Sequence, residues 1–460
     1  MIDRPEASRY LSIPELQATV RGRVIAPDDD GYDRARTVAL GGIDRHPAVI
    51  VKVADAADVA HVITLAREAG IELAVRSGGH SGAGHGVSHG GIVLDVSDMK
   101  GLEIDVEGRT AWAETGLTAA EVTAALAAHG LVVGFGDTGS VGIGGITLGG
   151  GVGYLVRKFG LTIDDLLAAE VVTADGCILH VDAESHPDLF WAIRGGGGNF
   201  GVATRFKYRL HPLDGIVGGM LLLPATPDVV AGFIAAAEAA PDDLSAIANV
   251  MPCPPMPFVP AEHHGELVVM ALMAYAGDAE AGARAVAPFR ALATPVADMV
   301  RPMPYPELYP PDDPDYRPTA ISRTLLMDHV DRDVAGLIVD RLNASDASLR
   351  VAQLRVLGGA MARVPVEATA FAHRRSRIMV NVAAFYDGPD DMPVREAWVT
   401  DFAAALEQGD SGAYVNFLGD EGEARVHAAY PGPTWDRLAA VKARYDPTNL
   451  FRLNQNIPPA

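Results

Sequence analysis

A glycine-rich window constrains this chain more than any other feature. Ten of the twenty positions from 134 to 153, which read GFGDTGSVGIGGITLGGGVG, are glycine. Glycine loses more backbone entropy on folding than any other residue, so such a run indicates a backbone that must approach a ligand closely. A second segment, VRSGGHS at 75–81, places a histidine behind two glycines. Together they predict a large phosphate-bearing cofactor held by backbone N–H groups, with one histidine at its reactive end.

Two glycine pairs in the window, at 142–144 and 149–151, do not match the usual dinucleotide-binding motif. A dinucleotide fold needs G-x-G-x-x-G directly after a strand. Gly142 and Gly144 are followed by Thr147 where the third glycine belongs, and the later glycine pair fails in the same way at Tyr154. No Gly-Lys-Ser/Thr of a Walker loop is present in the sequence. Glycine-rich turns in a tightly wound sheet, without any cofactor, remain the structural alternative.

Composition limits the classes of partner. The 460 residues include 37 basic and 59 acidic ones, a net charge of −22, which argues against binding nucleic acid or anionic membranes. The chain is long enough for two or three domains. The start of the chain lacks the apolar core of a signal peptide, and the uncharged stretch 138–156 is too glycine-rich to span a membrane. We therefore expect a cytoplasmic protein.

Two cysteines are too few for a disulfide framework or a thiolate metal cluster. They are Cys177 and Cys253. Cys177 follows a β-turn at Asp175 and Gly176, and we expect it to be an ordinary core thiol.

Hydrophobic periodicity predicts an α+β arrangement in the first two hundred residues. The expected strands and helices alternate over 48–76, 91–96, 110–130, 167–181, 188–194 and 202–210.

The middle of the chain, about 214–415, has a different pattern, which predicts one sheet with helices on one face. The segment 301–318, RPMPYPELYPPDDPDYRP, is too proline-rich for regular structure and predicts a surface loop. Expected strands are 217–223, 266–275, 350–357 and 377–385, and expected helices are 228–240, 278–291, 331–343 and 393–408.

Four motifs occur in one order along nearly the whole chain. They are RSGGHS at 76–81, GSVGIGGITLGGGVGYLVRKFGLTIDD at 139–165, DLFWAIRGGGGNFGV at 188–202 and YDPTNLFRLNQNIPP at 445–459. This combination closely resembles the flavin-linked oxidases of the vanillyl-alcohol oxidase / p-cresol methylhydroxylase superfamily, in their berberine-bridge-enzyme-like branch.

The resemblance implies an α+β fold in three stretches. Residues 1–213 would form a two-part FAD-binding domain of the p-cresol methylhydroxylase type. Residues 214–415 would form a substrate-binding domain, an antiparallel sheet covered by helices, and residues 416–460 would return to the FAD domain.

The resemblance also implies which residues bind FAD. His80 stands where the family attaches the flavin 8α-methyl group covalently, the glycine window would face the pyrophosphate and flavin, and Val202 would lie at the adenine end. The implied cofactor-binding residues are Arg76, Ser77, Gly78, Gly79, His80, Ser81, Thr138, Gly139, Ser140, Gly142, Gly144, Gly145, Gly149, Gly150, Gly151, Val202, Asn454 and Asn456.

Two positions in the window depart from, or refine, the family pattern. Doubly linked members carry cysteine in Cys-x-x-Val-Gly, and this chain has Thr138 there. A threonine hydroxyl cannot form the 6-S-cysteinyl bond, so we expect one covalent link, through His80. Val141 aligns with the position that faces the oxygen-reactive side of the flavin, where valine goes with oxidases, and this implies molecular oxygen as electron acceptor.

The implied reaction is hydride removal from a C–H bond next to nitrogen or oxygen of a small molecule, with reoxidation by oxygen to hydrogen peroxide. Carbohydrate-oxidising relatives use a tyrosine near Tyr-x-Asn-Tyr, and here Tyr414 and Asn416 are followed by Phe417. That change favours an amine or natural-product substrate and resembles the singly linked 6-hydroxy-D-nicotine oxidase group. An alcohol or carbohydrate oxidase, an oxidative cyclase and a flavin-binding protein without turnover remain alternatives.

The expected catalytic positions are Tyr414, Asn416 and Val141. Alternate positions of the expected roof strands supply substrate-pocket candidates, namely Gln353, Arg355, Met379 and Asn381.

Other chemistry-bearing residues have structural interpretations. His80, His85 and His89 could form a zinc site, but the glycines between them and the lack of a carboxylate argue against one, so we expect His85 and His89 to face solvent or pack in the loop. We assign no chemistry to five further residues. We expect Phe190 and Trp191 to belong to the core and Arg194 to anchor the glycine loop that follows it. We expect Asp164 and Asp165 to form a turn or cap.

Overall fold

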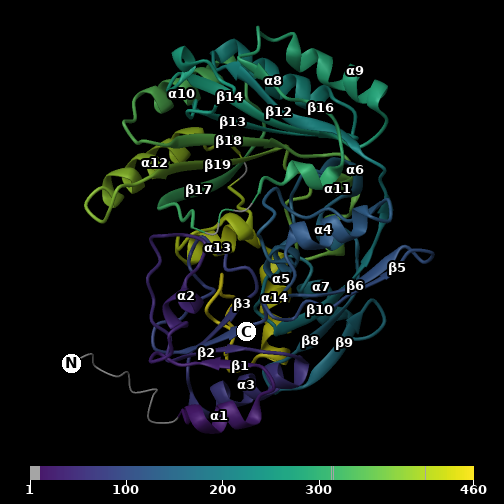
Figure 1. Ribbon diagram of the computed structural model, residues 1–460, viewed down its shortest axis with the longest axis vertical. Coiled ribbons are helices and arrows are strands. Elements are labelled where there is room, and N and C mark those ends of the chain that lie inside the picture. Colours follow the sequence, from purple (N-terminus) through teal and green to yellow (C-terminus); the bar gives the residue numbers. More distant parts are fainter. Residues whose placement is uncertain (1–10, 312, 314, 410) are drawn as a thin grey trace.

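The computed structural model describes residues 11–311, 313, 315–409 and 411–460. It consists of two layered parts, one above the other in Figure 1, with the C-terminal segment packed into the lower part. Most of the stretch on which we based the absence of a signal peptide, residues 1–10, lies outside the described residues. None of the described helices combines the length and the apolar character that crossing a bilayer requires.

A four-stranded sheet forms the base of the lower part, in the order β1-β2-β4-β3. β2 and β3 both pair in parallel with β4, and the crossover helix α3 starts at Asp55, whose carboxylate accepts hydrogen bonds from two N–H groups of the first turn. This sheet ends in the loop that carries the RSGGHS motif. The elements are α1 (Ile13–Thr19), β1 (Arg23–Ile25), α2 (Tyr32–Arg36), β2 (Val49–Lys52), α3 (Ala56–Ala69), β3 (Leu73–Arg76) and β4 (Ile92–Asp95).

A five-stranded antiparallel sheet, β5-β6-β10-β8-β9, completes the lower part, and a short β7–β11 pair lies beside it. The capping box between Thr118 and Glu121 starts α4 as the sequence predicts. The elements are β5 (Leu102–Asp105), β6 (Thr110–Glu114), α4 (Ala119–Ala127), β7 (Leu131–Val132), α5 (Ile143–Gly149), α6 (Val156–Phe159), η2 (Thr162–Asp164), β8 (Leu166–Val172), β9 (Ile178–Asp182), α7 (Pro187–Ala192), β10 (Val202–Arg209) and β11 (His211–Pro212).

One antiparallel sheet dominates the upper part, in the order β15-β12-β14-β13-β18-β19-β17, with β16 also paired to β12. Helices α8, α9, α10 and α12 cover its outer face (Figure 1) and share one apolar core with it. The elements are β12 (Ile216–Pro224), α8 (Pro227–Ala239), β13 (Leu244–Pro252), η3 (Ala261–His263), β14 (Leu267–Tyr275), α9 (Ala279–Arg290), β15 (Ala297–Asp298), β16 (Arg301–Met303), η4 (Tyr305–Leu308), β17 (Ala320–Met327), α10 (Arg332–Asn343), β18 (Arg350–Val356), α11 (Ala360–Arg363), η5 (Val366–Ala368), β19 (Ile378–Phe385) and α12 (Met392–Leu406).

The α+β class and the antiparallel sheet covered by helices are therefore confirmed. The C-terminal elements η6 (Val415–Phe417), α13 (Glu423–Ala429) and α14 (Pro433–Tyr445) follow, and α14 packs against α7 of the lower part. The exact domain limits, 1–213, 214–415 and 416–460, stay predictions.

The proline-rich segment 301–318 is not simply a surface loop, so that expectation was wrong for its first half. Arg301–Met303 forms β16, and Tyr305 and Tyr309 are buried. The Tyr309 hydroxyl donates to the backbone oxygen of Gly136, at 3.2 Å. The prolines prevent a long α-helix, but a short 3-10 helix, η4, forms, and the large apolar area of the tyrosines favours their burial.

Cys177 is exposed, which contradicts our expectation of a core thiol. It lies in the tight turn that joins β8 to β9, where its N–H donates to the Asp175 carboxylate. The turn projects into solvent, so the thiol follows it outward.

Candidate active site

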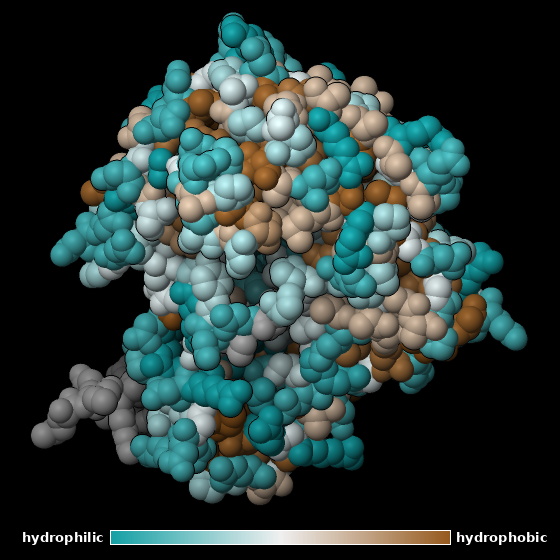
Figure 2. Space-filling model, turned by 45° about the horizontal axis from the view of Figure 1, so that its top comes forward, coloured by the Kyte–Doolittle hydropathy of each residue, from teal (hydrophilic) through white to brown (hydrophobic). Residues whose placement is uncertain are grey.

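A cavity of about 450 Å³ lies between the two parts, where the surface is hollowed in Figure 2. The loop after β3, the glycine window, the start of β10, two strands of the upper sheet and the C-terminal tail all line it. The sequence motifs, far apart in the chain, therefore meet at one site. Of the expected site residues, those that line it are Arg76, Ser77, Gly78, Gly79, His80, Ser81, Thr138, Val141, Gly142, Gly144, Gly145, Val202, Asn381, Tyr414, Asn416 and Asn454.

The two glycine segments cross at Gly78 and Gly142. A Cβ on Gly78 would lie 2.3 Å from the Gly142 nitrogen, and one on Gly142 would lie 2.0 Å from the Ser77 Oγ. Ser77 is itself fixed, because its hydroxyl donates to the Thr115 carbonyl at 2.6 Å. Only glycine fits at this crossing, which explains part of the glycine content without reference to a ligand.

Other glycines leave open space instead. A Cβ added to Gly145 or to Gly198 would meet no atom within 4 Å, and both residues line the cavity. Gly145 lies in the first turn of α5, whose N–H groups have no acceptor within the helix. These glycines therefore form a cradle in which backbone donors face a space that a side chain would fill.

Polar atoms without partners lie on the cavity wall and directly behind it. The Oδ1 atoms of Asn454 and Asn456 and one terminal nitrogen of Arg76 are buried and have no hydrogen-bond partner within the described residues. Buried polar groups are normally satisfied, so these atoms indicate a polar ligand. A dinucleotide with a pyrophosphate and a heterocyclic ring fits both the cradle and these atoms.

Comparison with known proteins identifies that ligand. The FAD binding domain family matches residues 47–182, and the berberine and berberine-like family matches residues 413–458. The FAD-linked oxidoreductase YvdP of Bacillus subtilis is 31% identical over 451 residues, which cover 95% of this chain and 98% of YvdP. This chain belongs to the berberine-bridge-enzyme-like FAD-linked oxidoreductases.

Two further similarities involve a nicotine-oxidising protein. The (R)-6-hydroxynicotine oxidase of Paenarthrobacter nicotinovorans is 29% identical over 463 residues, 96% of this chain and 97% of that protein. The crystal structure of 6-hydroxy-D-nicotine oxidase from Arthrobacter nicotinovorans superposes with a TM-score of 0.85 at 28% identity, over 96% of this chain and 99% of that one. The oxidoreductase and these relatives thus share their fold along their whole length.

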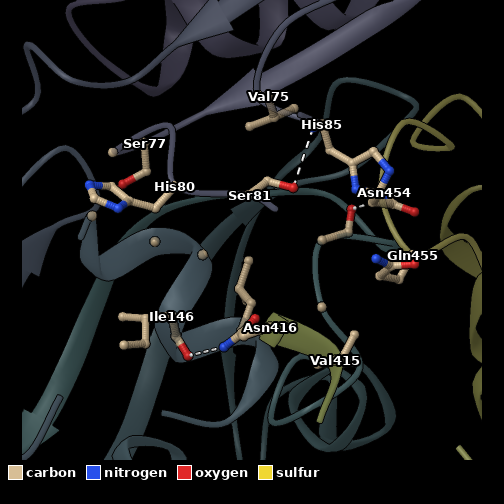
Figure 3. A pocket seen from close by; sticks show the side chains of 18 of the residues that line it. Val75, Ser77, His80, Ser81, His85, Ile146, Val415, Asn416, Asn454 and Gln455 are labelled. Atoms are coloured by element: carbon tan, nitrogen blue, oxygen red, sulfur yellow. Dashed lines mark hydrogen bonds between the residues drawn. The ribbon is translucent and has the colours of Figure 1, made fainter. Parts of the chain in front are cut away.

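Figure 3 shows how the loop after β3 follows one wall of the oxidoreductase's cavity. His80 lies near Ser77 at one end, and His85 lies near Asn454 at the other. Arg76, at the start of this loop, has most of its donors occupied, since its guanidinium pairs with Asp95 at 2.7 Å and donates to the Ala35 carbonyl. We expect Arg76 mainly to shape the loop, on which His80 and His85 both line the cavity.

Asn416 is held rigidly against the glycine window. Its Nδ2 donates to the Ile146 carbonyl at 3.1 Å (Figure 3) and to the Tyr414 hydroxyl at 2.9 Å. A Cβ on Gly149 would lie 2.0 Å from the Asn416 Oδ1, so the amide lies directly on that glycine. The fixed Nδ2 leaves the amide oxygen as the group that Asn416 can offer to a ligand.

The Tyr414 hydroxyl oxygen also accepts from the N–H groups of Gly151 and Val152, at 3.0 and 3.3 Å. Burial raises the pKa of Tyr414, and the hydrogen bonds to its oxygen oppose that rise only in part. Tyr414 therefore keeps its proton at neutral pH and serves to hold Asn416 and the end of the glycine window.

Six of the expected cofactor residues lie behind the cavity wall rather than on it. Gly149, Gly150 and Gly151 pack under Asn416, Phe371 and Thr162. They support the wall from behind, and the set is completed by Gly139, Ser140 and Asn456.

The four substrate candidates share one face of the upper sheet, opposite the helices. Register pairs Gln353 with Asn381 and Arg355 with Met379 on neighbouring strands. Only Asn381 lines the cavity; Met379 is buried among Phe371 and its neighbours. The expected alternation was correct, but most of these side chains act at a distance from the cavity.

Most residues for which we expected a structural role have one in the folded protein. Asp164 pairs with the buried Arg374 at 2.7 Å, and Asp165 with His211 at 2.8 Å, while Phe190 and Trp191 are buried.

One expectation was wrong. The Arg194 guanidinium donates to the carbonyls of Phe190 and Ala368, so it fixes α7 to η5 rather than the glycine loop.

His89 is exposed, but His85 lines the cavity, so our expectation that both merely face solvent or pack in the loop is corrected for His85. Burial and, to a smaller extent, the nearby Arg45 lower the pKa of His85 to about 4, and Asp420 opposes this shift only in part. The imidazole is thus neutral in the folded protein above that pH. No cluster of three possible metal ligands occurs among the described residues.

This shift predicts a pH-dependent stability. Below pH 6.5 the unfolded chain protonates His85 and the folded chain does not, so stability is lost as pH falls from 6.5 to about 4, by at most about 3 kcal/mol. Urea unfolding of flavin-free His80→Ala protein at several pH values should show this loss, and adding His85→Leu should remove it. An unchanged pH dependence in the double variant would contradict the prediction.

Several cavity residues were missed from the sequence. Ser322 belongs to a strand, β17, that hydrophobic periodicity did not predict, and Asn199 and Gln455 lie within motifs but were not singled out. Asp137 could have been found, since it is an acidic residue inside the glycine window, directly before Thr138.

Proposed function

We propose that this oxidoreductase is an oxidase that removes hydride from a C–H bond next to nitrogen, in a small amine or amine-bearing natural product. In this proposal His80 alone would hold FAD covalently, and the bound flavin would supply the hydride acceptor, with molecular oxygen as the final oxidant and hydrogen peroxide as its product. The chain's residues bind and orient the substrate and exclude water around the reacting carbon.

The lack of a tyrosine at the position of the sugar-oxidising pattern carries the choice of an amine. Phe417 lines the cavity where the sugar-oxidising pattern has tyrosine, and Tyr414 holds its proton in a buried network. An alcohol needs a base to take its O–H proton, whereas a neutral amine has a lone pair that assists hydride loss. The nicotine oxidase similarity supports the same substrate class.

Each part of the cavity wall has its own role in this proposal. Asn416, fixed on Gly149, lines the cavity, and Asn381 and Ser322 offer polar groups from the upper sheet. Val141 also lines the cavity, and its short side chain leaves room for a small molecule beside the bound ligand. Thr138 cannot provide a thioether, which supports a single link.

Oxygen reactivity tests the proposal. Protein reduced by dithionite without air should reoxidise rapidly when mixed with air. During turnover, each amine molecule oxidised should release one molecule of hydrogen peroxide. Val141→Leu should slow reoxidation at least about tenfold, a barrier change of ~1.4 kcal/mol, because it fills the space for oxygen. Val141→Ala is the control and should reoxidise as the parent does. Slow reoxidation of the parent protein would rule out an oxidase.

A further inference from the structure

Asp137 is the carboxylate of this cavity. Among the described residues that line it, no other aspartate or glutamate occurs. Its side chain is 20% exposed. In the sequence Asp137 directly precedes Thr138, inside the glycine window. No motif or comparison assigns Asp137 a role.

A chain of side chains from the upper sheet holds this carboxylate in place. The Arg355 guanidinium, 5% exposed, donates to the Asp137 Oδ2 and, through Nη2, to the Gln353 Oε1 at 2.7 Å. Gln353 donates in turn to the Asn249 Oδ1 at 2.7 Å. The guanidinium also lies over the Phe417 ring, 5.0 Å from its centroid. Groups on β13, β18 and η6 thus fix Arg355, and Arg355 fixes Asp137.

The other titratable groups that face Asp137 are neutral. Tyr154, Tyr305 and Tyr309 come from the lower part and from the proline-rich segment, and burial raises the pKa of each, that of Tyr309 to about 12. Among the described residues, Arg355 is the ion-pair partner that balances the Asp137 charge, and the pair has no net charge.

One carboxylate oxygen keeps capacity for a ligand. The Oδ1 of Asp137 accepts a single hydrogen bond, from the Thr138 hydroxyl at 3.3 Å, and a carboxylate oxygen can accept two. We propose that Asp137 is the specificity-determining acceptor of this cavity: its Oδ1 accepts a hydrogen bond from the N–H of a substrate amine, and Arg355 cancels its charge so that the cavity prefers the neutral amine to the ammonium ion. This inference rests on the proposed function and names the form of the substrate that the site selects.

The selection has a chemical purpose. Only the neutral amine has the lone pair that assists hydride loss, and an unbalanced carboxylate would instead attract and stabilise the ammonium form. With Arg355 in place, Asp137 orients the nitrogen without trapping its protonated state.

Binding to the oxidised holoenzyme tests this without turnover. Aniline is neutral near pH 7.5, carries N–H donors and has no C–H that can leave as hydride; chlorobenzene has the same shape without N–H donors, and phenyltrimethylammonium is a permanent cation. Calorimetric titration should show that the parent protein prefers aniline to both. Asp137→Asn should weaken aniline about tenfold or more and leave chlorobenzene unchanged, because Arg355 has only donors and will turn the new NH₂ group toward the cavity.

Two further variants complete the design. Arg355→Gln should favour phenyltrimethylammonium about tenfold relative to aniline, since the Asp137 charge is then uncompensated. Asp243→Asn is the matched control: Asp243 pairs with Lys158 at 2.8 Å, also between the upper and lower parts, but does not line the cavity. It should change none of the three affinities.

The inference is overturned if Asp137→Asn leaves aniline binding unchanged or weakens chlorobenzene equally. Should that variant fail to fold, a parent protein that prefers the cation to aniline would overturn it as well. Peroxide formation is measured separately. If the protein oxidises amines but does not bind aniline through Asp137, only this inference is wrong. A protein that binds aniline through Asp137 and never forms peroxide loses the proposed function instead.

Discussion

His80→Ala is expected to convert a protein that keeps its flavin through denaturation into one that releases all of it. His80 lines the cavity on the loop after β3, next to the crossing of the two glycine segments. We propose that its imidazole nitrogen forms the only covalent bond to the flavin, and alanine provides no nucleophile. After precipitation with acid, the parent pellet should be yellow, and the His80→Ala pellet colourless with FAD in the supernatant.

No cysteine among the described residues of the cavity wall offers a second link through sulfur. Thr138 stands where doubly linked relatives have cysteine, and neither Cys177 nor Cys253 is among the cavity-lining residues. His85→Ala is the matched control, since His85 lines the same cavity on the same loop, and its pellet should remain yellow. A colourless parent pellet, or a yellow one from His80→Ala, would contradict the single link.

Local sequence signals predicted most of the elements and the position of the site. The cap at Asp55 and the capping box at Thr118 mark real helix starts, and the expected strands of the upper sheet lie within one or two residues of the observed ones. These signals act over a few residues, so one sequence contains them completely. The glycine motifs also met at one cavity, because each must bring its backbone close to a single ligand.

Elements without a local signal were missed. β13, residues 244–252, is buried on both faces, so it has no polar alternation to reveal a strand. The helix α5 forms inside the glycine window although three of its seven residues are glycine, because the surrounding core and the Gly78 crossing fix it. Tertiary contacts decide both elements.

Long-range partners were equally out of reach. Asp137 and Arg355 lie 218 positions apart, and only the folded sheet brings them together. The sequence did place Gln353, Arg355, Met379 and Asn381 on one face, but their distance from the cavity depends on how the sheet packs. The expected alternation of side chains along these strands was therefore correct, although only Asn381 of the four lines the cavity.

Lys442→Met is expected to cost the largest share of folding stability among single changes near the site. Lys442 and Asp446 are fully buried and pair at 2.6 Å. The Lys442 ammonium also donates to the carbonyls of Asn199 and Phe451, at 2.8 and 2.9 Å. Burial lowers the pKa of Lys442, and the pairing with Asp446 opposes that change. Because both side chains are fully buried, protein groups rather than solvent must stabilise the charged ammonium.

Methionine preserves the length and removes the charge, which leaves the Asp446 carboxylate and two carbonyls without their donor. Breaking a buried pair from one side costs about 3–5 kcal/mol. Asp446 accepts hydrogen bonds from the N–H groups of Leu450 and Phe451, so the loss reaches the tail that carries Asn454 into the cavity. Urea unfolding should show the lower stability, together with weaker retention of FAD in a His80→Ala background.

A neighbour on the same helix gives the control. Arg444 pairs with Asp188 at 2.7 Å, but its side chain is 64% exposed. Arg444→Met should therefore cost no more than about 1 kcal/mol, because solvent screens a surface pair. If the two variants unfold at the same urea concentration, the buried ammonium does not hold the tail, and the support of the cavity must come from the apolar contacts of α14 instead.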